Sequence, residues 1–112
     1  RLLFPCSGAA DTGEISDRTA RRLARGGFGR MYCLAGVGGR VPSMLENMKV
    51  ASEIWAIDGC QEDCARRTLE LAGFAVAKHL RITDCGFEKG KSPANDENVA
   101  AMIAKAHAQV TC

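Results

Sequence analysis

The sequence lacks a long apolar run and lacks a large excess of charge of either sign. No segment approaches the roughly 20 consecutive apolar residues that a membrane-spanning helix needs, so an ordinary transmembrane protein is excluded. Lys and Arg number 15 against 13 Asp and Glu, and the net charge of +2 is too small to indicate binding to nucleic acid. We therefore expect neither a membrane nor a nucleic acid as a partner.

The sequence also lacks an initiator methionine and a secretory signal peptide. Because it opens within an expected strand, we expect a few residues to precede Arg1 in the complete protein, or the polypeptide to have been trimmed. The 112 residues are 46% apolar and 25% charged, which is ordinary for a globular protein. This length suffices for one core, and residues 1–112 are expected to form a single domain.

Cysteine, in contrast, is abundant, with six residues in the chain. A secreted scaffold held by disulfides would be shorter and denser in cysteine than this sequence. Cysteines set in a regular pattern of strands and helices favour metal binding or thiol chemistry in a reducing compartment. We therefore expect a cytoplasmic location.

Strand-type and helix-type patterns alternate along the whole chain. Strands are expected at 2–5, 31–34, 53–57 and 79–83, and helices at 12–25, 42–50, 61–71 and from 95 onward, with a glycine-rich turn at 35–40. Such alternation builds a parallel sheet covered by helices on both faces, with right-handed crossovers. The predicted fold is α/β, a three-layer αβα sandwich whose four-stranded parallel sheet has the strand order 2-1-3-4.

Three cysteines recur at a constant interval. Cys6, Cys33 and Cys60 lie 27 residues apart, about the length of one strand, loop and helix, so each is expected just beyond the carboxyl end of a strand. Cys85 follows the fourth strand in the same way, but is expected to be a packed thiol. Open parallel sheets bind ligands beyond these strand ends, where the strand order reverses, and the spacing therefore predicts a site at this edge.

Cys60 and Cys64 form a second pattern, because residues four apart share one face of a helix. The N-terminus of a helix favours a thiolate over a thiol. Together with Cys6 and Cys33, the pair predicts a metal site, for which zinc is the best occupant and an iron–sulfur cluster the second. Two small apolar residues buried in the core are the alternative explanation for such a pair.

Asp58 precedes the Gly59-Cys60 corner at the end of the third strand. It could orient a metal ligand or act as a base on bound water. A turn cap of the Asx type is the favoured interpretation.

Several other residues are candidates of lower rank. Ser7, Gly8 and Thr12 border a helix N-terminus and could hold a phosphate or another anion, although ordinary capping explains them equally well. His79 and His107 are expected away from the strand-end edge. Cys112 is expected to play no part, because it ends the chain.

The stretches Pro5-Cys6-Ser7-Gly8, Met31 to Gly39, and Ala56-Ile57-Asp58-Gly59-Cys60 through Cys64 together resemble a known family. They are similar to the DGC-domain proteins, small prokaryotic proteins named for their Asp-Gly-Cys motif and described as zinc-binding. The resemblance covers nearly the whole chain. It implies a zinc site of four cysteines, matching Cys6, Cys33, Cys60 and Cys64, and it implies no role for Cys85 or Cys112 and no particular activity.

The sequence therefore predicts a zinc-binding protein with a four-cysteine site at the strand ends, in which the metal has a structural or accessory role. A thiol-dependent enzyme, or a redox or sulfur-handling protein that uses Cys60 or Cys64, is the alternative. A metal sensor or carrier is a weaker one. The pattern identifies no substrate, no protein partner and no catalytic residue.

Overall fold

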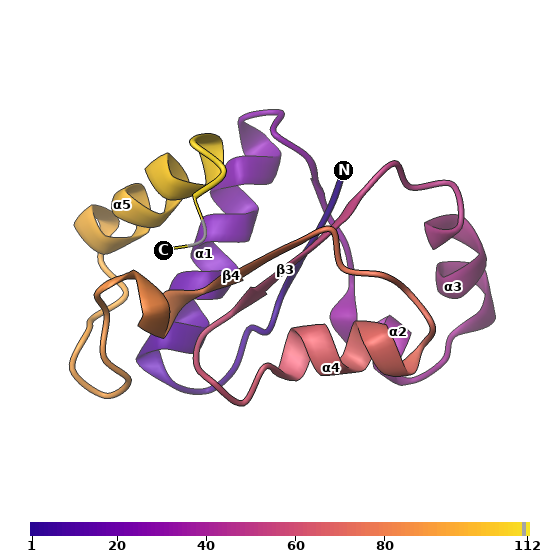
Figure 1. The fold of residues 1–112 in the computed structure, drawn as a ribbon, viewed down its shortest axis with the longest axis horizontal. Coiled ribbons are helices and arrows are strands. Elements are labelled where there is room, and N and C mark those ends of the chain that lie inside the picture. The colour runs from indigo at the N-terminus through magenta and orange to yellow at the C-terminus, as the bar shows by residue number, and fades with distance from the viewer. Residues whose placement is uncertain (111) are drawn as a thin grey trace.

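The computed structural model describes residues 1–110 and 112 of the chain (Figure 1). Its elements in chain order are β1 (Leu2–Pro5), α1 (Asp11–Arg25), β2 (Arg30–Met31), α2 (Leu34–Gly38), α3 (Pro42–Met48), β3 (Ile54–Asp58), α4 (Cys64–Leu71), β4 (Lys78–Arg81), the 3-10 helix η1 (Ile82–Cys85) and α5 (Asp96–His107). Within the described residues, no helix has the length and apolar character needed to cross a lipid bilayer.

The four strands form one parallel sheet in the order β2-β1-β3-β4, which confirms the predicted topology. In the register, Leu3 pairs with Met31 on one side and with Trp55 on the other, and Asp58 at the end of β3 pairs with Arg81. The central strands β1 and β3 are neighbours although a long stretch of chain separates them. Their carboxyl ends therefore meet at the place where ligands bind in open α/β sheets.

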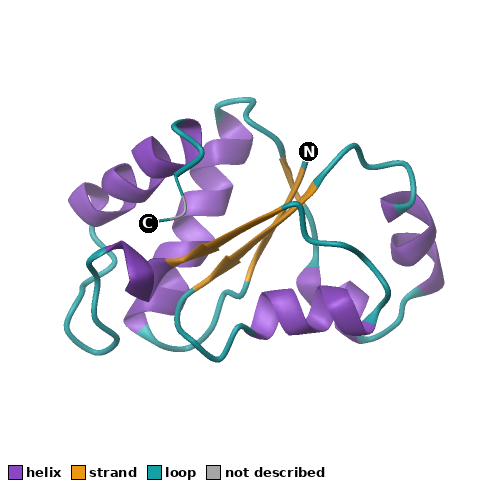
Figure 2. Cartoon of the chain, viewed as in Figure 1, coloured by secondary structure: helices purple, strands orange, loops and turns teal. Residues whose placement is uncertain are grey.

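Helices cover both faces of the sheet, which gives the three predicted layers (Figure 2). Strand residues alternate between the two faces. Trp55 and Ile57 pack in the core that α1 and α5 share, whereas Ile54 and Ala56 pack in the core that α4 completes. The buried residues of α1 thus lie against one face of β3, and Leu69 of α4 lies against the other.

The glycine-rich stretch 35–40 was expected to be a turn, and that expectation is wrong because α2 begins there. Cys33 caps this short helix, since its Sγ accepts a hydrogen bond from the amide of Gly36 at 3.4 Å. Val37 is fully buried, and a Cβ on Gly36 would overlap the sulfur of Met44. Tertiary packing therefore outweighs the low helix propensity of glycine here.

Other boundaries differ from the predicted ones for local reasons. The helix expected from residue 61 begins at Cys64, because Asp63 adopts a left-handed conformation with φ 54°. The helix expected to reach residue 50 ends at Met48, and Val50 is 89% exposed. The fourth strand ends at Arg81, where η1 takes over.

Cys85 and Cys112 form a disulfide, with their Cα atoms 5.2 Å apart. Cys85 is packed, as expected, but it is not a free thiol, and the expectation of no part for Cys112 is wrong. The bond ties the end of the chain to η1, directly after β4. Cys85 also packs against the core on the α1 and α5 side.

Candidate functional site

Four cysteines are free, and all four follow the carboxyl ends of neighbouring strands. Cys6 comes directly after β1, Cys33 two residues after β2, and Cys60 two residues after β3, while Cys64 is the first residue of α4. We call Cys6, Cys33, Cys60 and Cys64 the thiol edge. Cys6, Cys33 and Cys60 thus lie at strand ends, as the 27-residue spacing predicts.

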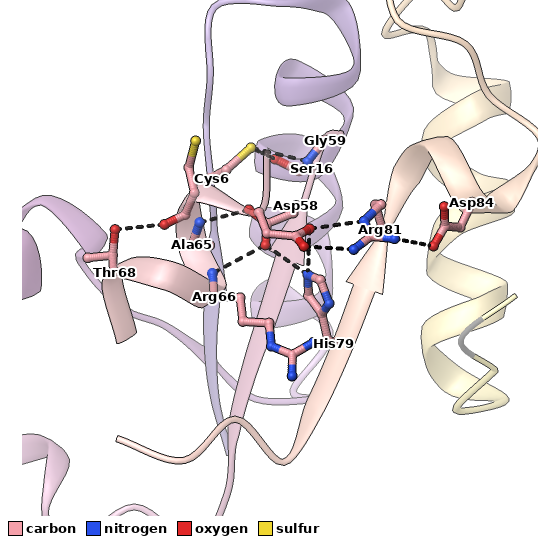
Figure 3. Close-up of polar contacts among 12 residues, drawn as sticks. Cys6, Ser16, Asp58, Gly59, Ala65, Arg66, Thr68, His79, Arg81 and Asp84 are labelled. Carbon is pink, nitrogen blue, oxygen red and sulfur yellow. Dashed lines mark hydrogen bonds and ion pairs between the residues drawn. The ribbon is translucent and has the colours of Figure 1, made fainter. Parts of the chain in front are cut away.

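Each of three sulfur atoms has one or two polar neighbours. Cys6 Sγ accepts a hydrogen bond from the amide of Gly59 at 3.3 Å and lies 3.3 Å from the hydroxyl oxygen of Ser16 (Figure 3). Cys33 Sγ accepts from Gly36, as described above, and Cys60 Sγ lies 3.7 Å from the ammonium nitrogen of Lys89. The contact with Gly59 joins the end of β1 to the residue that precedes Cys60.

Cys64 has a pKa raised above the ordinary thiol value. Although the residue is exposed as a whole, the first cause is partial desolvation of its thiol, and the negative charge of Asp58 is the second. Cys6, Cys60 and Glu62 also act on this thiol in the same direction. The predicted preference for thiolate at this helix N-terminus is therefore not found at Cys64.

A cleft of about 520 Å³ opens at the ends of β1 and β2 and has both Cys6 and Cys33 in its lining. Tyr32 and, from α4, Thr68 also line it. Arg21 on its rim is bonded to Asp17 at 2.7 Å. The cleft gives the thiol edge an opening of the size that small molecules occupy in proteins.

Asp58 is 1% exposed and fixes the start of α4. Its carboxylate accepts hydrogen bonds from the backbone amides of Ala65 at 2.7 Å and Arg66 at 3.2 Å. The nominal N-cap, Asp63, makes no side-chain bond to the helix. Asp58 therefore satisfies first-turn donors that the local sequence leaves open. This is a capping role, but it is not the Asx-type turn cap favoured from the sequence, because the bonded amides lie seven and eight residues further along the chain.

His79 approaches the same carboxylate, with Nε2 2.8 Å from Asp58 Oδ2 (Figure 3). The expectation that His79 lies away from this edge is therefore wrong. In the register, His79 pairs with Ala56, two residues before Asp58. The histidine and the aspartate are thus diagonal neighbours on one face of the sheet, a relation that can be recognised only when the register is known.

Asp63 forms a second ion-pair system beside this one. Arg81 donates to its two carboxylate oxygens at 2.9 and 2.7 Å, which lowers the pKa of Asp63, and Arg81 also bonds Asp84 at 2.9 Å. Ligand atoms of Asp58, Asp63 and His79 all lie within 4.8 Å of one another, so these side chains are a possible metal-binding group. Their ligand atoms already have hydrogen-bond partners, and the guanidinium of Arg81 opposes a cation there.

Gly59 is required by a close approach of two backbones. A Cβ at this position would lie 2.7 Å from the amide nitrogen of Gly13 and 2.8 Å from the carbonyl carbon of Thr12. The start of α1 therefore packs directly on the turn that follows β3. A side chain at residue 59 would separate α1 from the thiol edge.

The loop proposed for anion binding is occupied by contacts of its own. Ser7 donates to Asp17 at 2.8 Å, and the amide of Thr12 donates to the Asp11 carboxylate at 2.7 Å. The hydroxyl of Thr12 is buried and has no hydrogen-bond partner among the described residues. An anion at Ser7, Gly8 and Thr12 stays a prediction.

Comparison with known proteins agrees with the resemblance noted in the sequence. A sequence profile described as the DGC domain matches residues 2–106. The chain belongs to the DGC-domain family. The Asp-Gly-Cys of this DGC domain is Asp58-Gly59-Cys60, at the centre of the geometry described above.

Among curated proteins, this DGC domain is similar to the anaerobic and virulence modulator AnvM of Pseudomonas aeruginosa. The two are 32% identical over 88 residues, which cover 79% of this chain and 67% of AnvM. No solved structure matches the chain. The relationship confirms the family and leaves the chemistry of the site to be inferred from its residues.

Proposed function

We propose that this DGC-domain protein binds one zinc ion through Cys6, Cys33, Cys60 and Cys64, in a structural or accessory role. The observation that supports this best is the division of the cysteines: these four are free at one edge of the sheet, while the other two are joined as a disulfide. Four thiolates are a typical ligand set for structural zinc, and an iron–sulfur cluster is the less favoured occupant.

Zinc binding would draw the thiol edge together. Four ligands at about 2.3 Å from zinc lie about 3.8 Å from one another in a tetrahedral site. Among the described residues, no three of the four sulfur atoms fall within 4.8 Å of one another. We therefore expect binding to shift Cys33, which is exposed and carried by the short helix α2, and to couple metal affinity to stability.

Elemental analysis tests the proposal on protein purified without added metal. We expect one zinc and no iron per chain, with the four thiols protected from alkylation until a chelator is added. Removal of the metal should lower the melting temperature sharply, because zinc contributes on the order of ten kcal/mol to small zinc domains. An unchanged melting temperature, with zinc confirmed absent, would refute the structural role.

Matched variants locate the metal. Cys60→Ser and Cys64→Ser should each reduce the zinc content, whereas the double variant Cys85→Ser, Cys112→Ser should retain it. If the zinc content is unchanged in Cys60→Ser and Cys64→Ser but is lost in Asp58→Asn and His79→Gln, zinc binds at the possible metal-binding group instead.

A second candidate is a thiol-dependent enzyme, or a redox or sulfur-handling protein, that uses Cys60 or Cys64, and its support is that both thiols are free. The cleft is lined by Cys6 and Cys33 and supports a small-molecule site at the thiol edge without touching this pair. Of the two, Cys60 is the better suited, because the pKa of Cys64 is raised. In reduced protein stripped of metal, Cys60 should then react with iodoacetamide much faster than the other thiols near neutral pH. Slow and uniform labelling of all four would eliminate this candidate.

A cytoplasmic location is part of the proposal, because four reduced thiols persist in a reducing compartment. The disulfide between Cys85 and Cys112 instead favours an oxidising compartment. Trapping the thiols with a membrane-permeable alkylating agent in intact cells, followed by denaturation with a chelator while the agent is still present, decides between them. A cytoplasmic protein should then yield six labelled cysteines and a protein from an oxidising compartment four.

A further inference from the structure

Lys89 reaches the thiol edge from a loop that no part of the zinc proposal uses. Its ammonium nitrogen lies 3.7 Å from Cys60 Sγ. The loop runs between η1 and α5, so this contact joins segments 29 residues apart in the chain. Of the contacts to cysteine sulfur atoms described above, the contact from Lys89 is the one made by a charged group.

The backbone on both sides of Lys89 is held in place. The carboxylate of Asp11, at the start of α1, accepts hydrogen bonds from the amides of Gly90 at 2.8 Å and Ser92 at 3.1 Å. The hydroxyl oxygen of Ser92 accepts from the amide of Glu88 at 2.8 Å. Gly90 has φ 88°, a conformation that other residues rarely adopt. These contacts hold the backbone at Lys89 within reach of Cys60, while the lysine side chain itself is exposed.

Within the part of the chain that the structure describes, the other groups that contact these sulfur atoms or raise the pKa of Cys64 are negative or neutral. Asp58 and Glu62 both act on the thiol of Cys64 as negative charges. The donors to Cys6 and Cys33 are backbone amides, which carry no net charge. Arginines nearby are already neutralised, since Arg21 is bonded to Asp17 and Arg81 to two aspartates.

Four thiolates around a doubly charged zinc ion leave the centre with two negative charges. Next to further carboxylates, such a centre is stabilised by any cation in contact with its sulfur atoms. A hydrogen bond from an ammonium group to a thiolate is charge-assisted and stronger than one from a neutral amide.

We propose that Lys89 is the counter-cation of the thiol edge: its ammonium group holds the Cys60 thiolate and offsets the negative charge of the zinc-bound form. This inference rests on the proposed zinc site. It assigns the loop at 88–92 a role in retaining the metal, through charge rather than through ligation.

Zinc affinity measured by competition with a chromophoric chelator tests the assignment in the full chain. Lys89→Met removes the charge and keeps most of the apolar stem, and Lys89→Arg keeps the charge. Lys91→Met is the matched control, because Lys91 lies in the same loop, is exposed and pairs with Glu88. We expect Lys89→Met to bind zinc about tenfold more weakly, equal to about 1.4 kcal/mol, and the other two variants to stay within about threefold of the wild type.

The salt dependence supplies a second readout. Raising the ionic strength from about 0.1 M to 1 M shortens the screening length from about 10 to 3 Å, so the difference between Lys89→Met and the wild type should become smaller. Equal affinities of Lys89→Met and Lys91→Met would overturn the assignment, as would a Lys89→Arg variant as weak as Lys89→Met. If the wild type binds no zinc, the proposed function itself fails, which is a different result from zinc binding that ignores Lys89.

Discussion

The six cysteines of this protein occupy two regions that are held in different ways. Cys85 and Cys112 are joined covalently, and their bond closes the segment from η1 to the end of the chain. The thiol edge has no such bond, and its cysteines are positioned by backbone hydrogen bonds and by the close contact of Gly59 with α1. Cys85, like the thiol edge, follows the carboxyl end of a strand, so this position alone does not distinguish a bonded sulfur from a free one.

The difference indicates what each sulfur is available for. A sulfur in a disulfide offers no thiolate to a metal or a substrate, and its bond stabilises the fold. A free thiol that accepts one weak hydrogen bond can still ligate a metal or react. The structure thus separates sulfur used for stability from sulfur left free for chemistry. The predictions below test this separation.

Among the substitutions below, each measured without metal, loss of the disulfide should have the largest effect on stability. Cys112→Ser removes the bond without disturbing the core, because Cys112 is exposed. Closing a loop of 27 residues contributes about 3.5 kcal/mol in the chain-entropy treatment, so the free energy of unfolding in urea should fall by about that amount under oxidising conditions. Cys33→Ser, measured without metal, is the control and should change it by less than about 0.5 kcal/mol. If both variants lost the same free energy of unfolding, the proposed difference between the disulfide region and the thiol edge would be wrong.

Gly59→Ala should be nearly as harmful, by about 3 kcal/mol. The added Cβ would meet backbone atoms of Thr12 and Gly13 that cannot move aside as a flexible side chain would. Gly38→Ala is the matched control, since its Cβ would lie 3.6 Å from the Thr68 side chain, and it should change the free energy of unfolding by less than about 1 kcal/mol. A harmless Gly59→Ala would show that α1 can separate from the thiol edge at little cost.

Asp58→Asn should cost about 2 kcal/mol, because an amide offers one acceptor where the carboxylate serves two backbone amides and His79. Asp84→Asn provides the comparison. Asp84 is half-exposed and pairs with the same arginine as Asp63, and an exposed pair contributes under about 1 kcal/mol. Chemical denaturation at pH 7 measures both, and the prediction is wrong if Asp84→Asn proves the more costly.

The smallest expected effect is the loss of stability at low pH when Asp11 becomes protonated. The backbone amide of Gly90 is the chief cause that lowers the pKa of Asp11 below its ordinary value of 3.8, with Ser92 and Thr12 adding to it. A carboxyl whose pKa is lowered by folding stabilises the fold when ionised, so this contribution is complete above pH 3.8 and disappears as the pH falls through the lowered pKa. The amide proton shifts of Gly90 and Ser92 in NMR spectra should titrate with a midpoint below 3.8. A midpoint above 3.8, or titration that persists in Asp11→Asn, would contradict it.

The sequence predicted the parallel sheet correctly, because hydrophobic patterning and the alternation of strand and helix indicate it. The strand order was also correct, but it was a first choice among the orders that right-handed crossovers allow. It also placed the four free cysteines at the strand ends. It did not predict α2, since helix propensity argued against a glycine-rich segment and only the burial of Val37 and the cap from Cys33 overcome it.

The contacts that organise the site depend on tertiary structure. The pairing of His79 with Asp58 follows from a register of β3 and β4 that no local pattern specifies. Lys89 lies in a polar loop that looks like a connector, and Asp11 holds that loop from the far end of the chain. The disulfide pairs Cys85 with Cys112, which lies after α5, and periodicity does not show which cysteines the tertiary structure brings together.

The three residues of Asp58-Gly59-Cys60 face three different neighbours: the first holds α4, the second admits α1, and the third meets Lys89. A short tripeptide thus serves as a junction at which two helices and a loop are set against one strand. Substitution of Asp58 should loosen α4, substitution of Gly59 should displace α1, and substitution of Cys60 should change the sulfur site. A deep mutational scan would separate these effects into three classes.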